Sequence, residues 1–232
     1  PWNYPLQILG RTIGGSLTMG NCCVLKPGEE ASITSLMIGE LALQAGIPPG
    51  VFNIVPGLGS EAGESLINHS GVDHLSFTGS TEVGKLVQKS AANNVVPVTL
   101  ELGGKSPQIV FSDADLNKAL PFIVNASIQN CGQTCSAASR VLIEKKIYDK
   151  LLDLLIEKFN ELTVGPALRD LDCGPLISVK QKKRLEKYLK QAKSDGLNFS
   201  AEGKIVFDAP KGGNYVKPVL INDVPPDNSL AQ

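Results

Sequence analysis

Histidine is scarce in this sequence, and its cysteines form no recognisable metal-binding or disulfide pattern. The 232 residues include two histidines and five cysteines, with no C-x-x-C pair. Common zinc sites need closely spaced cysteine and histidine ligands, so no metal site is expected. An odd number of cysteines at irregular spacing is typical of free thiols in a reducing compartment, which predicts a cytoplasmic protein.

Long apolar runs and a dominant charge are also missing. No run approaches the roughly 20 consecutive apolar residues of a membrane span. Lysine plus arginine number 22 and aspartate plus glutamate 23, for a net charge of -1, so neither a nucleic acid nor a membrane is an expected partner. The chain opens at Pro1, within the segment PWNYP, which predicts a piece of a longer protein and leaves its targeting open.

What is present is the composition of a globular protein, 42% hydrophobic and 19% charged. Over the first hundred residues, short strand-like runs alternate with helical patterns. Strands are predicted at 22–25, 51–55, 74–77 and 95–100, and helices at 32–46, from a cap at Ser60, and at 80–91. The helix at 32–46 places four apolar residues on one face, namely Ile33, Leu36, Met37 and Leu41. Strands that are each followed by a helix predict a parallel sheet, which binds nucleotides at the carboxyl ends of its strands and on helix N-termini.

After residue 103 the pattern changes to longer and more charged helices. Strands are predicted at 108–111 and 140–143, and helices from about 115, at 146–161 and at 180–194. The last helix has a narrow apolar stripe among lysines, which is typical of an outer helix facing solvent. We therefore predict two domains, 1–102 and 103–232.

Two glycine segments imitate a phosphate-binding P-loop, and each lacks a residue that the P-loop needs. The segment from Gly79 to Lys85 matches G-x-x-x-x-G-K, but Leu86 follows where a serine or threonine must bind magnesium. The ending Gly104-Lys105-Ser106 has Thr99 in the place of the first glycine. A P-loop nucleotide switch is therefore the weakest hypothesis. The first segment still predicts a strand, a glycine and then a helix that begins near Ser80. This helix start either binds an anion or is an ordinary capped helix.

Two polar side chains have both a chemical and a structural interpretation. Glu101 lies between two leucines and runs into two glycines, so it is either a partly buried general base or a strand-end carboxylate in solvent. Asn3 is held among prolines and aromatic residues. Its amide either donates to a developing oxyanion or belongs to a turn.

The cysteines fall into two kinds of surroundings. Cys135 has small and polar neighbours, which indicate an accessible loop or a helix start where a thiolate is stabilised. Cys131 is predicted to be a spectator on the same segment. Cys22, Cys23 and Cys173 lie among valine, leucine and proline and are predicted to be buried and inert. From the residues alone, Cys135 is either a nucleophile or one more inert thiol.

Read in order, five motifs resemble those of the aldehyde dehydrogenase superfamily of the NAD(P)-dependent, hydrolytic type. They are PWNYP at 1–5, LKPGE at 25–29, FTGSTEVG at 77–84, LELGGKSP at 100–107 and GQTC at 132–135. The resemblance covers essentially the whole chain and is densest up to Arg140. It implies an α/β fold, with a Rossmann-like parallel-sheet cofactor domain followed by an α/β catalytic domain that carries the nucleophilic cysteine. It also implies that this chain is the central fragment of a longer protein.

The resemblance implies a role for each matching residue. Cys135 would attack the aldehyde, Glu101 would activate water, and Asn3 would form the oxyanion hole with the backbone N–H of Cys135. Lys26 and Glu29 would hold the adenosine ribose. Further cofactor contacts would be Pro1, Trp2, Asn3, Gly59, Gly63, Phe77, Gly79, Ser80, Val83, Gly84, Leu102 and Gly103.

The implied reaction is oxidation of an aldehyde to a carboxylic acid through a thiohemiacetal and a thioester on Cys135. The carboxylate of Glu29 would repel the 2′-phosphate of NADP, so NAD is the expected cofactor. Glu101 favours release of a free acid over acylation of coenzyme A, which is the alternative activity. A non-catalytic cofactor-binding relative is a further alternative. The resemblance also implies a homodimer or homotetramer, and a later Phe-Gly-Pro motif that has no counterpart in these residues.

Overall fold

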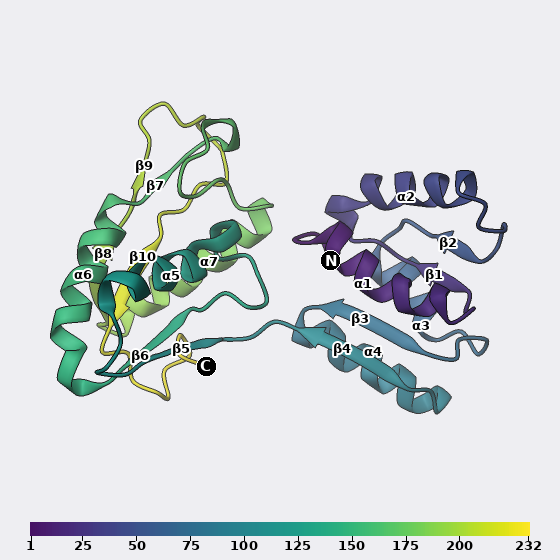
Figure 1. Cartoon of the computed structure of the whole chain (residues 1–232), viewed down its shortest axis with the longest axis horizontal. Helices are drawn as coiled ribbons and strands as arrows, with labels where there is room; N and C mark the ends of the chain where they lie inside the picture. The colour runs from purple at the N-terminus through teal and green to yellow at the C-terminus, as the bar shows by residue number, and fades with distance from the viewer. The chain divides into compact units, whose positions relative to one another are not determined.

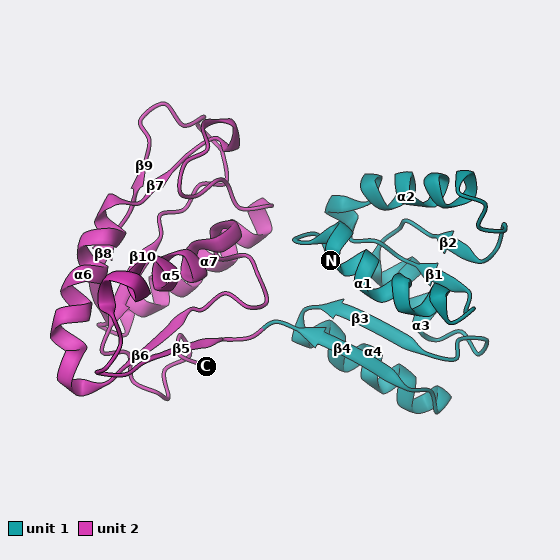
Figure 2. Ribbon diagram, viewed as in Figure 1, with its two compact units in different colours: residues 1–103 teal, residues 104–232 magenta.

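A computed structural model describes residues 1–232. Figure 1 shows its helices and strands, and Figure 2 shows the two units into which they divide, unit 1 at 1–103 and unit 2 at 104–232. Both units combine helices with parallel strands, which confirms the predicted α/β class. No helix is both long and apolar enough to cross a membrane.

Unit 1 is built from short strands and helices, and its first three strands each lead into a helix. In chain order its elements are α1 (Pro5–Thr18), β1 (Cys23–Leu25), η1 (Glu29–Ala31), α2 (Ile33–Gln44), β2 (Phe52–Ile54), η2 (Gly59–Gly63), α3 (Glu64–Ile67), β3 (Leu75–Gly79), α4 (Thr81–Asn94) and β4 (Val98–Leu102). Strand β1 pairs with β2, and β3 pairs with β4, both in parallel. The predicted parallel pairing is therefore confirmed.

Helix α4 packs along β3 and β4 because one face of the helix is small and apolar (Figure 1). Val87 and Ala91 are buried against Leu75 in the core of unit 1. Gly84 is buried on the same helix, where an added Cβ would come within 2.6 Å of the Leu102 side chain. Glycine at position 84 therefore allows the helix to approach the strand closely.

The structure of unit 1 differs from the sequence predictions at three points and adds one observation on α2. Helix α1 was not predicted, since Gly14 and Gly15 lower its helical propensity. Ser60 caps no helix, because η2 already begins at Gly59 and has no side-chain cap. The strand predicted at 95–100 lies at 98–102, since Val95 adopts φ 55° and ends α4. The apolar face of α2 is exposed, with Ile33 73% and Met37 56% accessible.

Unit 2 contains three α-helices together with two parallel strand pairs and one antiparallel pair. Its elements are β5 (Pro107–Val110), α5 (Leu116–Ile128), η3 (Gln129–Gly132), β6 (Arg140–Ile143), η4 (Lys145–Ile147), α6 (Tyr148–Glu161), β7 (Thr163–Val164), η5 (Ala167–Arg169), α7 (Val179–Ser194), β8 (Asn198–Glu202), β9 (Lys204–Ile205) and β10 (Val219–Asn222). Strands β5 and β6 are parallel, as are β7 and β9, whereas β8 and β10 are antiparallel. The sequence predicted β5, β6 and the three α-helices, but not β7 to β10.

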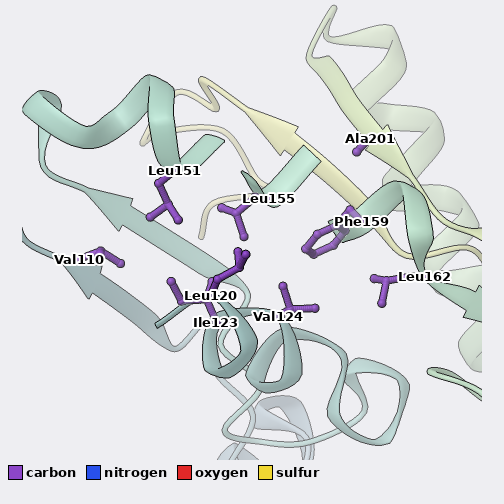
Figure 3. Packing of buried hydrophobic residues seen from close by; sticks show 9 residues of the cluster. All are labelled: Val110, Leu120, Ile123, Val124, Leu151, Leu155, Phe159, Leu162 and Ala201. Atoms are coloured by element: carbon purple, nitrogen blue, oxygen red, sulfur yellow. The ribbon is translucent and has the colours of Figure 1, made fainter. Parts of the chain in front are cut away.

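The core of unit 2 lies between α5 and α6 (Figure 3). On α6, Leu151, Leu155 and Phe159 recur every four residues, so they share one face of the helix. They meet a second buried set on α5 and β5, namely Leu120, Ile123, Val124 and Val110. Burial of this continuous apolar set is the main stabilising contribution to unit 2.

Leu155 is 2% exposed at the centre of this core. We expect Leu155→Ala to lower the free energy of unfolding by about 2–5 kcal/mol, because it leaves a cavity as well as removing apolar contact. Leu168 is fully exposed, so Leu168→Ala is the matched control and should change stability by less than about 0.5 kcal/mol. Denaturant unfolding measures both. Equal effects of the two substitutions would contradict this assignment of the core.

Candidate active site

The first group of predicted site residues meets where β1 and β2 end in unit 1. Lys26 Nζ donates to Glu29 Oε1 at 3.0 Å, and the backbone N–H of Gly59 donates to the same oxygen at 2.7 Å. An added Cβ on Gly63 would lie 3.6 Å from the Lys26 side chain. The structure thus brings together Lys26, Glu29, Gly59 and Gly63, although the last two come from a different turn of the chain.

Glu29 is held as a carboxylate by these contacts. Burial acts to raise the pKa of Glu29, but hydrogen bonds from its own backbone N–H, from Lys26 and from Gly59 outweigh it and lower that pKa. The Glu29 side chain is 44% exposed, and both distances above involve Oε1. The carboxylate therefore keeps accepting capacity toward a hydroxyl group that approaches from solvent.

Pro1 and Trp2 lie beside this group. An added Cβ on Gly28 would stand 3.3 Å from the Trp2 backbone nitrogen and 3.4 Å from the Pro1 carbonyl carbon. Asn3 follows them, partly buried, just before α1. The segment that contains the predicted oxyanion residue is therefore packed on the LKPGE turn.

The second group lies where β3 ends and α4 begins. Ser80 caps α4, and its Oγ accepts from the Val83 N–H at 3.3 Å. Gly79 precedes it, where an added Cβ would come within 2.5 Å of the Phe77 ring. The predicted helix start at Ser80 is confirmed. Its exposed first turn leaves backbone N–H groups for an anion, and a side chain at position 79 would collide with Phe77.

Glu101 lies on β4, beside Thr78 of β3. Its side chain is 50% exposed and its Oε1 is 3.4 Å from Arg11 Nη1. The side chain is therefore half exposed, which agrees with the interpretation of a strand-end carboxylate that reaches solvent. The sequence does not predict the contact of Arg11 with Glu101. Arg11 lies on α1, a helix that was not predicted, and nothing in the local sequence links the two residues.

Cys135 lies in an exposed turn of unit 2, where the Ala137 N–H donates to the Thr134 carbonyl at 3.2 Å. The predicted accessibility is confirmed. The alternative of a helix start is wrong, since no helix begins here. The cysteine therefore depends on the loop itself for its position.

Hydrogen bonds on both sides fix this loop. Before the cysteine, Gln133 Nε2 donates to the Asn130 carbonyl at 3.1 Å, and the Ile177 N–H donates to Gln133 Oε1 at 3.0 Å. After it, the Ala138 carbonyl accepts from Gln108 Nε2 at 3.2 Å and from Ser127 Oγ at 3.0 Å. An exposed thiol on a loop that is anchored at both ends is suited to repeated attack on a small substrate.

The other cysteines only partly match their prediction. Cys173 is buried, as predicted. Cys22 is exposed and Cys23 is partly exposed, so the prediction of buried thiols is wrong at Cys22 and incomplete at Cys23. Strand β1 is short and pairs on one side only with β2, which leaves its start open to solvent. No cluster of three or more histidine, cysteine, aspartate or glutamate side chains is arranged to hold a metal ion.

Parallel strand pairs that end in glycine-containing turns before helices define unit 1 as an α/β unit. Comparison with known proteins identifies the family. The chain belongs to the aldehyde dehydrogenase family, whose profile matches residues 1–232. DhaS of Bacillus subtilis (strain 168), assigned as an aldehyde dehydrogenase, is 42% identical over 233 residues, which is all of this chain and 46% of DhaS.

Solved structures agree with this assignment. A Burkholderia cenocepacia protein assigned as an aldehyde dehydrogenase superposes with a TM-score of 0.97 at 57% identity, covering all of this chain and 49% of that one. The NAD+ complex of the Bacillus cereus aldehyde dehydrogenase gives 0.93 at 39% identity, covering 47% of that chain. The chain thus spans about half the length of the relatives it matches.

Proposed function

We propose that this protein oxidises an aldehyde to a carboxylic acid, with NAD as the cofactor and Cys135 as the nucleophile. The observation that carries the proposal is the exposed Cys135 thiol on a loop anchored at both ends. Membership of the aldehyde dehydrogenase family supports the reaction class. The Bacillus cereus relative is an NAD+ complex, which supports the same cofactor here.

The residues of unit 1 fit an adenosine ribose. A carboxylate with free accepting capacity at Glu29, beside the Lys26 ammonium, matches the hydroxyl pair of a ribose. Gly59 and Gly63 border the same group without side chains, which leaves room for the adenine base. Because a 2′-phosphate would meet the Glu29 carboxylate, the site favours NAD over NADP.

The first turn of α4 suits the pyrophosphate. An anion would meet the start of α4, where Gly79 carries no side chain and Ser80 caps the helix by accepting from the Val83 N–H. Gly84 contributes by letting α4 pack on Leu102. The other residues proposed along the cofactor are Pro1, Trp2, Asn3, Phe77, Leu102 and Gly103. Bound NAD supplies the acceptor for the hydride.

The chain's own residues supply the rest of the chemistry. The Cys135 thiolate attacks the aldehyde carbonyl and forms a carbon–sulfur bond. The Asn3 amide and the Cys135 backbone N–H donate to the resulting alkoxide; one such donor is worth about 10²–10³ in rate. After oxidation to the thioester, Glu101 accepts a proton from water, which attacks the acyl carbon and releases the acid and the Cys135 thiolate.

The alternative product is an acyl coenzyme A, formed by the same nucleophile. The solvent-exposed carboxylate of Glu101 favours hydrolysis, because water has access to it. Product analysis separates the two, since hydrolysis gives a free acid whether or not coenzyme A is added. A homodimer or homotetramer and a cytoplasmic location complete the proposal, the latter supported by five free cysteines.

Replacement of Cys135 tests the nucleophile. We expect Cys135→Ala to abolish NADH formation over a panel of aliphatic, aromatic and amino-aldehydes, because no carbon–sulfur bond can form. Cys22 is also exposed, so Cys22→Ala is the matched control and should keep the rate of the unsubstituted chain. If the unsubstituted chain makes no NADH, selective alkylation of Cys135 over Cys22 still supports the assignment. No turnover and no selective labelling would refute it for this chain.

Replacement of Glu29 tests the ribose site. Glu29→Gln should weaken NAD binding by about tenfold to a hundredfold, since a hydrogen bond to a charged group contributes about 1.5–3 kcal/mol. It should also narrow the preference for NAD over NADP, because the repulsion of the 2′-phosphate is removed. Glu30→Gln is the control on the next residue, and isothermal titration measures each affinity. The assigned ribose site would be contradicted if Glu29→Gln and Glu30→Gln both bound NAD, and both bound NADP, with the affinities of the unsubstituted chain.

A further inference from the structure

Two cysteines that the proposed reaction does not use meet in unit 2. Cys131 lies in η3, and Cys173 lies between η5 and α7. The Cys131 sulfur lies against the residue that follows Cys173, since the Gly174 N–H donates to it at 3.1 Å, so the two cysteines are neighbours although they are far apart in sequence. Cys131 is partly exposed, whereas Cys173 is 6% exposed. One thiol of the pair is therefore open to solvent and the other lies behind it.

The backbone fixes both partners. The Gly174 N–H donates to the Cys131 sulfur at 3.1 Å, and the Gly174 carbonyl is 3.3 Å from the same sulfur. Cys173 is tied to the start of β7, since its N–H donates to the Thr163 carbonyl and its carbonyl accepts from the Gly165 N–H, each at 3.0 Å. These contacts hold the Cys131 sulfur next to the backbone of Cys173 and Gly174.

The contacts make Cys131 the more acidic thiol. A hydrogen bond from Cys173 lowers the pKa of Cys131 to about 7. Burial acts to raise this pKa, and the hydrogen bond from the Gly174 N–H lowers it further. The hydrogen bond to Cys131, burial and the charges of Cys131 and Asp172 raise the pKa of Cys173. The lowered pKa increases the share of Cys131 that is thiolate, the form that reacts with oxidants.

We propose that Cys131 and Cys173 form a redox modification site, in which a hydroperoxide converts the pair into a reversible intrachain disulfide. The Cys131 thiolate attacks one peroxide oxygen, so that a sulfur–oxygen bond forms, the oxygen–oxygen bond breaks and the leaving oxyanion takes a proton from water. Cys131 is then a sulfenic acid. Cys173 loses its proton and attacks that sulfur, which forms the disulfide and expels hydroxide. The two thiols lose two electrons in total, and the peroxide gains them.

The second step is favoured by the first. The hydrogen bond to the Cys131 anion and the negative charge of Cys131 both raise the pKa of Cys173. Once Cys131 is a neutral sulfenic acid, both causes disappear and Cys173 loses its proton more easily. Cys135 lies on the same loop and is not consumed. Only Cys131 and Cys173 are oxidised, and a thiol reductant converts their disulfide back into two thiols.

Thiol mapping on the whole chain tests the proposal. The chain is treated with hydrogen peroxide, free thiols are blocked with iodoacetamide, and the protein is digested with and without reduction and analysed by mass spectrometry. We expect an unreduced peptide that links Cys131 to Cys173, its loss on reduction, and the same linked peptide in Cys135→Ala. A peptide that links Cys131 to Cys135, or oxidation of Cys131 with no linked peptide, would overturn the proposal.

Variants of the pair give a second readout that does not require the linked peptide. In Cys173→Ala, Cys131 has no resolving partner, so peroxide should carry it to the sulfinic acid, which reductants do not reverse. Recovery of the Cys131 thiol after reduction should therefore be lost in this variant and kept in Cys22→Ala, the control. Equal recovery in both variants would show that Cys173 does not protect Cys131 and would overturn the proposal.

Discussion

Parallel strand pairing is the constraint on which the candidate site in unit 1 depends. The register of β3 and β4 sets Thr78 opposite Glu101 and Gly79 opposite Leu102, so the helix start at Ser80 and the proposed base emerge at one edge. The register of β1 and β2 sets Leu25 opposite Ile54, so Lys26 and the turn leading to Gly59 emerge together. Each strand end delivers one part of the site, because parallel strands finish on the same side of a sheet.

Fixed backbone contacts, and not burial of charge, position the reactive groups. Glu29 is held by Lys26 and by the Gly59 N–H, and the Cys135 loop is held through Gln133 and the Ala138 carbonyl. Hydrogen bonds that are already in place cost no reorganisation when substrate or cofactor arrives. A backbone hydrogen bond likewise holds the Cys131 sulfur at Gly174, the residue that follows Cys173.

Local signals in the sequence predicted what is local in the structure. The Ser80 cap and the strand at 140–143 depend on neighbours within a few residues. The contact of Arg11 with Glu101 and that of Cys131 with Cys173 join segments that only the fold brings together, and no periodicity or spacing marks them. The two-residue strands β7 and β9 were also missed, since two residues carry little pattern.

The most direct test of the account is an NMR titration of the ¹⁵N-labelled chain with NAD. We predict shifts of the backbone amides that line the proposed cofactor site, above all those of Gly59, Ser80 and Val83, with no change along α6 in the core of unit 2. Shifts of these amides would show that the strand ends of unit 1 form the dinucleotide site. Saturable binding that moves α6 and leaves Gly59 and Ser80 unchanged would contradict the central claim.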